Sequence, residues 1–248
     1  FKILVIANKN DTANTRERWD ILENGSEEKN LFLDTGSILE ERIMRGSYTM
    51  NLFGGQDVEV GAERAQTILD SNLALGLLSG SEAPSQAFGG LSPVNIPNAN
   101  TRVEEVRYEP FAIHNWRISP RMSLETSLVY ETSEISMSGD VSNSRDFNFF
   151  KPKLDYRFDV TPQLQLRVLI EKVVRQLSFT DFVATSDQDD EDSNTLAGNS
   201  NLRPDYWWNY NLLAEYRLPD DQGVVSANFY HHRHKDLLQR IDVSPGPN

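Results

Sequence analysis

The sequence of 248 residues contains no cysteine, which excludes disulfide bonds and thiolate metal sites. It also has no run close to the roughly 20 apolar residues that a membrane-spanning helix needs. A transmembrane β-barrel is not excluded by this, because its apolar face is spread along each strand in alternation. Cations are scarce as well, since 24 Lys and Arg residues stand against 37 Asp and Glu residues, a formal net charge of -13. This balance argues against nucleic acid and anionic lipid surfaces as partners.

Catalytic motifs are missing too. The sequence has no Gly-x-Ser-x-Gly elbow, no phosphate-binding glycine loop and no His-Glu-x-x-His. The adjacent carboxylates of Glu104 and Glu105 would face opposite sides of a strand, so they cannot act as a pair. We therefore expect no enzyme activity, no catalytic residues and no cofactor.

Two clusters invite a metal-site interpretation. In the run 231–234, only His232 and His234 could converge on one side of a strand, and no carboxylate accompanies them at suitable spacing. The acidic run 187–192 lacks the spacing and the glycine of an EF-hand. We therefore expect an ordinary polar strand end and a solvated loop, with no metal site; the loop could also meet divalent cations that bridge lipopolysaccharide.

What the sequence does contain is alternation with a period of two, clearest between Phe147 and Leu218. Such a period predicts β-strands with one apolar face and one mainly polar face. The strands run to roughly twelve residues or more, against a usual five or six, and a tilted strand crosses a bilayer with about 9–11. The alternating apolar residues are Phe150, Leu154, Tyr156, Phe158, Leu164, Leu166, Val168, Ile170, Tyr206, Trp208, Tyr210, Leu212, Ala214 and Tyr216.

Similar but less regular patterns predict further strands, about nine or ten in all. Residues 65–78 could also form an amphipathic helix, but Gly54-Gly55 is a hairpin signal and favours a strand there. Residues 10–30 are polar and predict a connection rather than a strand. The predicted strands are Phe1–Lys9, Ile38–Phe53, Asp57–Leu75, Thr101–Ile118, Met122–Glu131, Phe147–Val160, Gln163–Leu177, Asp205–Leu218 and Val224–Ile241.

The connections between these strands carry a second signal. Tight turns are predicted at Gly54-Gly55, Ser119-Pro120, Thr161-Pro162 and residues 219–223. Longer polar loops are predicted at Leu77–Asn100, Ser138–Arg145 and Ser178–Pro204. Short and long connections alternate, so a meander would collect the short turns at one end and the long loops at the other, as in transmembrane barrels.

Aromatic residues at the apolar positions of the alternation lie near both ends of the strands. Aromatic side chains are enriched in this way at the two interfaces between a bilayer and water. They are Trp116, Phe158 and Tyr216 near the short turns, and Tyr130, Phe150, Tyr206 and Trp208 near the long loops. A soluble β-sandwich also has alternating strands, but strand length, turn order and aromatic placement favour the barrel. The predicted fold is all-β: part of an antiparallel up-and-down transmembrane β-barrel.

Two segments resemble the barrel of TonB-dependent outer-membrane receptors. Leu166-Arg167-Val168 with the following residues 174–182 looks like a strand and loop of that family. Residues 199–205, Asn-Ser-Asn-Leu-Arg-Pro-Asp, are similar to its Asn-x-x-Leu-x-Pro-Glu entry into a strand. The next strand, with Phe229-Tyr230 and then residues 235–238, also fits. The resemblance is specific from about Arg102 to Asp242, with Gln176 and Asp205 standing where the family has Pro and Glu.

The resemblance implies active uptake of a scarce nutrient across the bacterial outer membrane, with energy from TonB. The substrate class stays open between siderophore-bound iron, cobalamin, an oligosaccharide and similar molecules. A passive porin-like or adhesin-like barrel and a soluble β-rich binding domain are the alternatives. Expected partners are TonB, outer-membrane lipid and lipopolysaccharide, and a small-molecule or oligosaccharide substrate.

The domain assignment follows from the same resemblance. We expect residues 1–248 to be part of one barrel domain, with the N-terminal plug, through which TonB would act, and the C-terminal strands outside the sequence given. The chain starts at Phe1 without a signal peptide or initiating Met, which fits a piece of a longer protein.

The polar parity of the strands would face the barrel lumen, where side chains solvate the lumen, contact a plug or touch substrate in transit. From the strand alternation we expect Lys151, Lys153, Asp155, Arg157, Asp159, Arg167, Glu171, Arg175, Glu215 and Arg217 there. The candidates for substrate contact among them are Arg157, Arg167, Glu171, Arg175 and Arg217.

Overall fold

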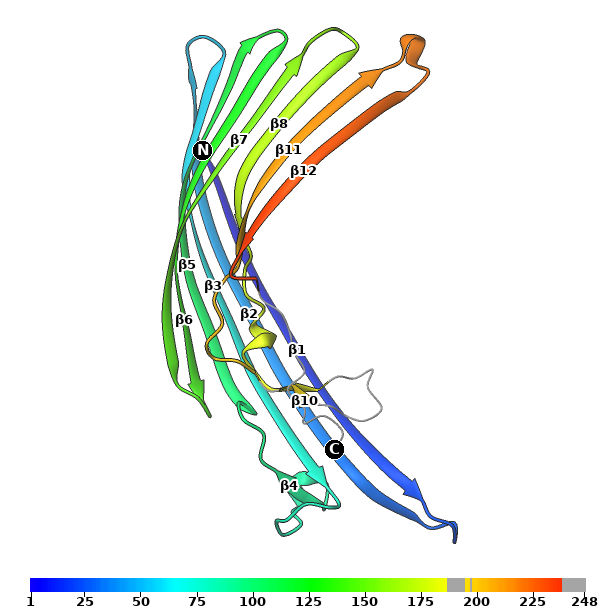
Figure 1. The fold of residues 1–248 in the computed structure, drawn as a ribbon. Coiled ribbons are helices and arrows are strands. Elements are labelled where there is room, and N and C mark those ends of the chain that lie inside the picture. Colours follow the sequence, from blue (N-terminus) through cyan, green and yellow to red (C-terminus); the bar gives the residue numbers. More distant parts are fainter. Residues whose placement is uncertain (187–194, 197, 238–248) are drawn as a thin grey trace.

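A computed structural model describes residues 1–186, 195–196 and 198–237. Within these ranges the protein is almost entirely β-structure, and nearly all strands belong to one antiparallel sheet of ten strands. The sheet order is β1-β2-β3-β5-β6-β7-β8-β11-β12, with the short β4 on β3. The sheet is strongly curved and does not close (Figure 1). This confirms the predicted all-β meander and the predicted strand number.

The strands are long. The bounds of the nine strands on the main path are β1 Lys2–Ile21, β2 Glu27–Leu52, β3 Gln56–Leu77, β5 Asn100–Ser119, β6 Met122–Gly139, β7 Asn143–Asp159, β8 Leu164–Val174, β11 Tyr206–Arg217 and β12 Val224–Lys235. The short strands are β4 Ser92–Val94, β9 Thr185–Ser186 and β10 Thr195–Leu196, and three 3₁₀ turns span Gln86–Phe88, Phe179–Asp181 and Pro219–Asp221. Among the described residues, no helix is long and apolar enough to cross a bilayer.

The hairpins β2-β3, β5-β6, β7-β8 and β11-β12 turn back at the same end of the sheet, at the top of Figure 1. We call this end the turn side and the opposite end the loop side. Gly54 and Gly55 both have positive φ, 72° and 70°, a conformation that favours glycine and suits a tight hairpin. The segment 65–78 lies in β3, so the strand interpretation is confirmed over the helical one.

Two connections differ from the prediction. Residues 10–30 were predicted to be a polar connection, but β1 and β2 run through them and meet at the short turn 22–26. The predicted long loop Ser138–Arg145 is also wrong, because β6 continues to Gly139 and β7 begins at Asn143. On the loop side only the connections 78–99 and 175–205 are therefore long, and the strict alternation of short and long connections fails there.

The register fixes which side chains share a face of the sheet. Directly paired residues of neighbouring strands point to the same face. We call the face that carries Tyr156 the outer face and the face that carries Arg157 the inner face. One row on the outer face crosses six strands, from β5 to β12, through Trp116, Leu124, Tyr156, Val168, Leu212 and Phe229.

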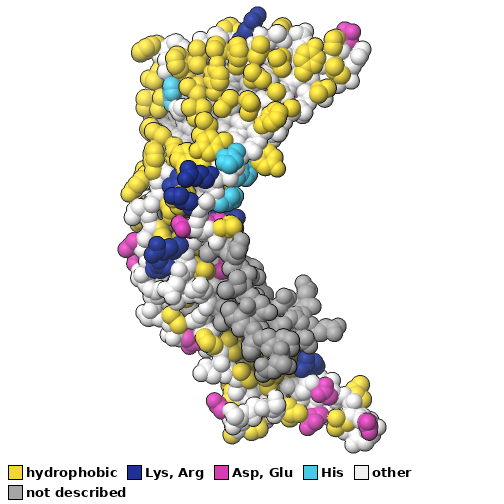
Figure 2. Space-filling model, viewed as in Figure 1, with side chains coloured by type: hydrophobic (Ala, Val, Ile, Leu, Met, Phe, Trp, Pro, Cys, Tyr) yellow, Lys and Arg dark blue, Asp and Glu magenta, His cyan; other side chains and the backbone are white. Residues whose placement is uncertain are grey.

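On the turn side the outer face is apolar. A second outer row continues through Thr126, Leu154, Ile170 and Tyr210. Phe150, Leu128, Leu166 and Ala214 belong to the same face, as the alternation predicted. Figure 2 shows the resulting band of hydrophobic side chains over the turn side of the molecule.

The buried core lies on the loop side, against the inner face. Leu69, Val103 and Met137 lie in one inner row, and residues of the connection 175–205 cover them. A second cluster joins β2 and β3 to the connection 78–99. The first cluster consists of Leu69, Val103, Ile135, Met137, Leu177, Phe179, Phe182 and Val183, and the second of Leu31, Leu33, Leu73, Leu75, Ile96, Ala99 and Ala184.

Candidate functional site: the inner face of the sheet

Four of the five candidate residues lie on inner-face strand positions. Arg157 pairs with Arg167 across β7 and β8. Glu171 is opposite Lys153 on β7 and Asn209 on β11, and Asn209 donates a hydrogen bond to it at 2.9 Å. Arg217 ends β11, and Arg175 follows directly after β8. The candidates are therefore spread along the inner face and do not converge on one point.

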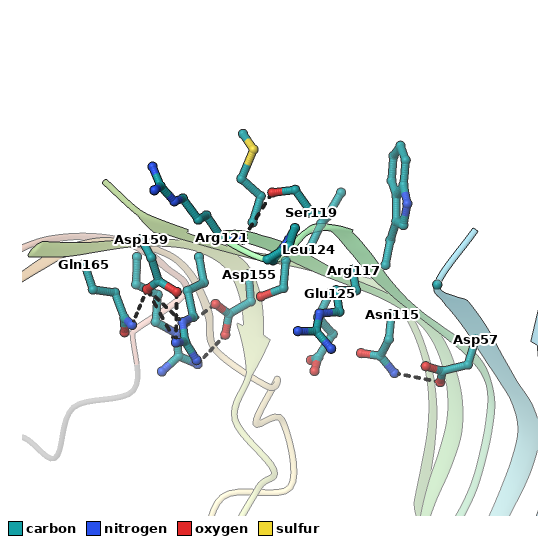
Figure 3. A pocket seen from close by; sticks show the side chains of 17 residues that line it. Asp57, Asn115, Arg117, Ser119, Arg121, Leu124, Glu125, Asp155, Asp159 and Gln165 are labelled. Carbon is teal, nitrogen blue, oxygen red and sulfur yellow. Dashed lines mark hydrogen bonds and ion pairs between the residues drawn. The ribbon is translucent and has the colours of Figure 1, made fainter. Parts of the chain in front are cut away.

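A hollow of about 630 Å³ opens on the inner face at the turn side. Figure 3 shows Asp57, Asn115, Glu125, Asp155 and Asp159 projecting from one side of the sheet into it. Arg157 and Arg167 line the hollow, and Arg217 lines a smaller one beside it. These residues come from β3, β5, β6, β7, β8 and β11.

Two of the four arginines that line this hollow, Arg157 and Arg167, are paired sideways with carboxylates. Arg167 donates Nε to Asp155 Oδ1 at 2.8 Å and forms a second, shorter contact from Nη2 to Oδ2, a bidentate arrangement. Arg157 lies 3.2 Å from Asp159, which also accepts a hydrogen bond from Gln165 at 2.7 Å. About half of the side chains of Arg157 and Arg167 remains exposed. The hollow therefore presents donors and acceptors side by side, which suits a polar partner better than a simple anion.

Towards the loop side, the inner face carries a ladder of alternating charges that spans five neighbouring strands, which we call the charge ladder. Arg45 lies 3.7 Å from Glu63, and Arg107 lies 3.7 Å from Glu63 and 3.6 Å from Glu109. Lys151 contacts Glu109 and lies 2.7 Å from Glu131. Between Glu63 and Lys151 each side chain is at most about a fifth exposed. Desolvated charges of this kind persist because every one of them has an opposite partner.

The connection 175–205 approaches the charge ladder. A cavity of about 230 Å³ separates them, lined by Glu105, Arg107, Glu109, Glu131, Lys151, Val174, Arg175, Gln176, Leu177 and Pro204. Gln176 donates a hydrogen bond to Glu105 at 3.1 Å. Arg175 Nε lies 3.3 Å from the carboxylate of Asp205, which is fully buried. Arg175 thus belongs to the loop side, away from the hollow that holds Arg157 and Arg167.

The two long connections are joined to each other as well as to the sheet. Ala184 N–H donates to the carbonyl of Asn98 at 3.2 Å, and Asn98 Nδ2 donates to the carbonyl of Gly198 at 2.9 Å. A Cβ at Gly198 would collide with the backbone of Phe182, so this close approach needs glycine. The connections therefore form one cover over the inner face. The acidic run 187–192 lies outside the described residues.

None of the residues of the charge ladder was among the five residues predicted to contact substrate. The sequence feature that could have placed them on the inner face is the alternation of Arg107 and Glu109 with Val106 and Tyr108 along one predicted strand. The juxtaposition of Glu63, Arg107 and Lys151 depends on register between strands far apart in sequence, which a single sequence does not give.

The histidine run lies on β12. His231 belongs to the outer face beside Tyr210, and His232 and His234 belong to the inner face with ring centroids 6.0 Å apart. Within residues 1–186, 195–196 and 198–237, no group of three or more His, Cys, Asp or Glu residues is arranged to hold a metal ion.

Comparison with known proteins identifies the fold. The alcaligin outer-membrane receptor FauA of Bordetella pertussis has a TM-score of 0.53 at 11% identity, over 98% of this chain and 40% of that one. The hemophore receptor HasR of Serratia marcescens gives 0.59 at 12%, over 94% and 36%. The ferric-catecholate import receptor Fiu of E. coli K12 gives 0.56 at 11%, over 98% and 42%.

These likenesses establish a shared fold, and the chain spans about two fifths of the length of each of these structures. No curated protein matches the sequence. The family model described as "TonB dependent receptor-like, beta-barrel" matches residues 9–248, well beyond the segment that carried the resemblance. The open sheet is thus part of an outer-membrane barrel, and the chain belongs to the TonB-dependent receptor family.

Proposed function

We propose that the protein containing this chain is an active uptake receptor, which captures a scarce nutrient outside the cell and imports it with energy from TonB. The observation that carries the proposal is the family match over residues 9–248. The polar inner face agrees with it, because a lumen that passes a water-soluble substrate must be hydrated.

An iron complex is the proposed substrate class. The structural relatives are, by their names, receptors for alcaligin, for a hemophore carrying heme, and for ferric catecholates. Cobalamin and an oligosaccharide are the alternatives. On the loop side, the exposed guanidinium of Arg175 and the cover formed by the two long connections offer polar groups to an incoming ligand.

The two turn-side hollows suggest a different role for Arg157, Arg167 and Arg217, and Glu171 lies on the same inner face. We assign these residues to contact with a plug domain supplied by the rest of the protein, or with substrate in transit. Paired but half-exposed guanidinium groups support this assignment, because they keep free donors for a polar partner. TonB would act through that plug and would not touch the barrel segment described above.

The test is uptake of candidate iron complexes by cells that express the full-length protein, in strains with and without a working TonB system. Active transport predicts accumulation only in the strain with TonB. Equal uptake in both strains would reject it and favour a passive porin-like barrel. Absence of uptake in both strains for all candidate complexes, with the receptor present at the surface, would point to an adhesin-like role.

A further inference from the structure

One edge of β7 is unpaired over much of its length. β7 is paired with β6 from Asn143 to Phe158, but with β8 only from Lys153 to Asp159. Figure 1 shows β5 and β6 continuing past the loop-side ends of β8, β11 and β12. Residues 143–152 of β7 therefore have β6 on one side and no strand of the described ranges on the other.

The backbone hydrogen bonds show which main-chain groups lie on this edge. The Asp159 N–H donates to the carbonyl of Arg121, directly before β6, at 2.8 Å. Successive residues of an antiparallel strand bond to opposite neighbours, so the odd-numbered residues of β7 bond to β6 and the even-numbered residues point away from it. Pro152 is even-numbered and has no N–H, which fits the end of the β8 pairing beside it. The free N–H and C=O groups belong to Ser144, Asp146, Asn148 and Phe150, which we call the open edge.

The connection 175–205 passes beside the open edge without pairing to it. Asn143 and Arg145, both on the inner face, use their side chains to donate hydrogen bonds of 2.6–3.0 Å to carbonyls of the connection, those of Ser200, Asn201 and Leu202. No main-chain group of the open edge bonds to a residue that the structure describes in this connection. Main-chain groups on a strand edge form a template for a further strand.

The outer side chains at the open edge carry an uncompensated negative charge. Asp146 pairs directly with Glu134 of β6 on the outer face, and both side chains are exposed. Ser144 Oγ donates to Glu134 at 3.0 Å, but neither carboxylate has an ion pair within the described part of the chain. Like charges directly opposite each other destabilise a strand pair, whereas opposite charges stabilise it. A cation opposite Asp146 on a further strand would complete this row.

We propose that the open edge of β7 is a docking site for an extended segment of a protein ligand, which joins the sheet as a further antiparallel strand. The segment carries Lys or Arg at the outward position opposite Asp146. Its inward side chains lie beside the rings of Phe147 and Phe149, which are stacked with centroids 6.4 Å apart. Main-chain bonds supply the affinity of such an added strand, and alternate side chains supply its specificity.

The position of the open edge suits an external protein. Ser144, Asp146 and Asn148 lie past Phe150 on the loop side of the apolar band, and the long loops of outer-membrane barrels are extracellular. The docked segment would lie at the wall of the barrel and not in a substrate path. The proposal therefore does not depend on the identity of the transported substrate.

The test uses the full-length receptor purified in detergent and fluorescent peptides of about nine residues, long enough for one strand. The first peptide has valine at inward positions, threonine at outward positions and lysine at the central outward position. The second has glutamate in place of that lysine, and the third is the first peptide with N-methyl groups on its outward residues. Binding is measured by fluorescence polarisation, and amide hydrogen exchange of residues 143–150 is followed by mass spectrometry.

Two pairs of variants separate main chain from charge. Asn148→Pro removes one N–H of the open edge and leaves the bonds of the odd-numbered residues to β6, whereas the control Asn148→Ala loses the same side chain and keeps the N–H. Asp146→Asn removes the charge, and its control Glu28→Gln removes an exposed acidic residue of β2. Heat modifiability on a gel verifies that each variant is folded.

The lysine peptide should bind the parent at least about fivefold more tightly than the glutamate peptide and slow hydrogen exchange in residues 143–150. N-methylation and Asn148→Pro should each weaken binding at least about tenfold, with Asn148→Ala and Glu28→Gln within about twofold of the parent. Asp146→Asn should abolish the preference for lysine.

The docking site would be overturned by equal binding to Asn148→Pro and Asn148→Ala, by undiminished binding of the N-methylated peptide, or by the absence of binding. Protection from exchange outside residues 143–150 alone would do the same, since the peptide would then bind elsewhere, for example in the lumen. Equal binding of the lysine and glutamate peptides would refute the assigned charge of the partner. If Asn148→Pro does not fold, the N-methylated peptide and the exchange pattern decide.

Discussion

The turn side and the loop side of this sheet are built on the same strands but carry their apolar side chains on opposite faces. On the turn side of β5, the apolar residues Tyr108, Ala112 and Trp116 have even numbers and lie on the outer face. On the loop side of the same strand Val103 has an odd number, lies on the inner face and is fully buried.

The same exchange occurs along β2, β3 and β6. Leu31 and Leu33 of β2 are inner and buried, whereas Met44 and Tyr48 are outer and exposed. Lipid covers the outer face on the turn side, and folded connections cover the inner face on the loop side. Along each of these strands the apolar side chains therefore move from the outer face to the inner face where lipid gives way to the folded connections. The strands themselves continue through this point.

The largest effect should come from removing the cover. Phe182→Ala empties a position that is 1% exposed, and Phe→Ala in a core costs about 3–5 kcal/mol. The loss should open the connection 175–205 and leave the barrel folded. We expect faster proteolysis within that connection in the full-length protein. Thr180→Ala, at an exposed position of the same connection, is the control, and equal cleavage rates in both variants would contradict the cover.

A charge on the outer face of the turn side should cost slightly less. Val168→Arg or Leu154→Arg should lower the free energy of unfolding by about 2–4 kcal/mol, because an arginine near the midplane must leave water. Urea unfolding in lipid vesicles measures this. Leu169→Arg is the matched control, since Leu169 is the next residue of β8 and lies on the inner face. If Leu169→Arg were the more damaging change, the assignment of the two faces would be reversed.

The charge ladder should respond differently from the exposed pairs beside it. Lys151→Gln leaves Glu109 and Glu131 without their shared cation, and we expect a loss of about 1–3 kcal/mol. Lys153→Gln, one inner position further along β7, removes a pair with Glu125 in which both side chains are more than a third exposed. Such a pair contributes at most about 1 kcal/mol. Equal losses in the two variants would show that the ladder is no more desolvated than its surroundings.

The smallest effect on stability should follow deletion of residues 187–192. The anchors on either side, Ala184 and Gly198, hold the connection to Asn98 through backbone atoms, and shortening a loop changes its closure entropy by less than about 1 kcal/mol. Thermal unfolding of the full-length protein should be nearly unchanged. Ligand capture should weaken if this acidic run meets the substrate, and uptake assays on the same cells separate the two effects.

The sequence predicted the turn side well, because each face there meets one uniform environment. The alternation from Phe150 to Phe158 and from Leu164 to Ile170 is regular, and the structure confirms its faces. The placement of Arg157, Arg167, Glu171 and Arg217 on the inner face follows from the same parity. Their contact with substrate stays a prediction.

The loop side was harder to predict for a physical reason. Residues 10–30 lie beyond the apolar band, where much of both faces is polar, so no alternation marks the second half of β1 and the start of β2. Their pairing, for example Asn14 with Thr35, comes from the neighbouring strand. The composition of residues 138–145 resembles a loop, yet Met137 and Asn143 are still paired. In β5 the apolar positions change from odd numbers at Val103 to even numbers at Tyr108, so the sequence shows no single alternation along this strand.

The length of β2 has a consequence for how the receptor is presented on a cell. Residues 27–43 of this strand lie beyond the apolar band, which on β2 begins at Met44. At about 3.4 Å per residue they extend on the order of 50 Å, or about 40 Å in height at a tilt of about 45°. The turn at Glu23 should therefore stand clear of the membrane surface, within reach of antibodies and other large probes. Because the described sequence has no cysteine, one cysteine introduced there would report that height on living cells.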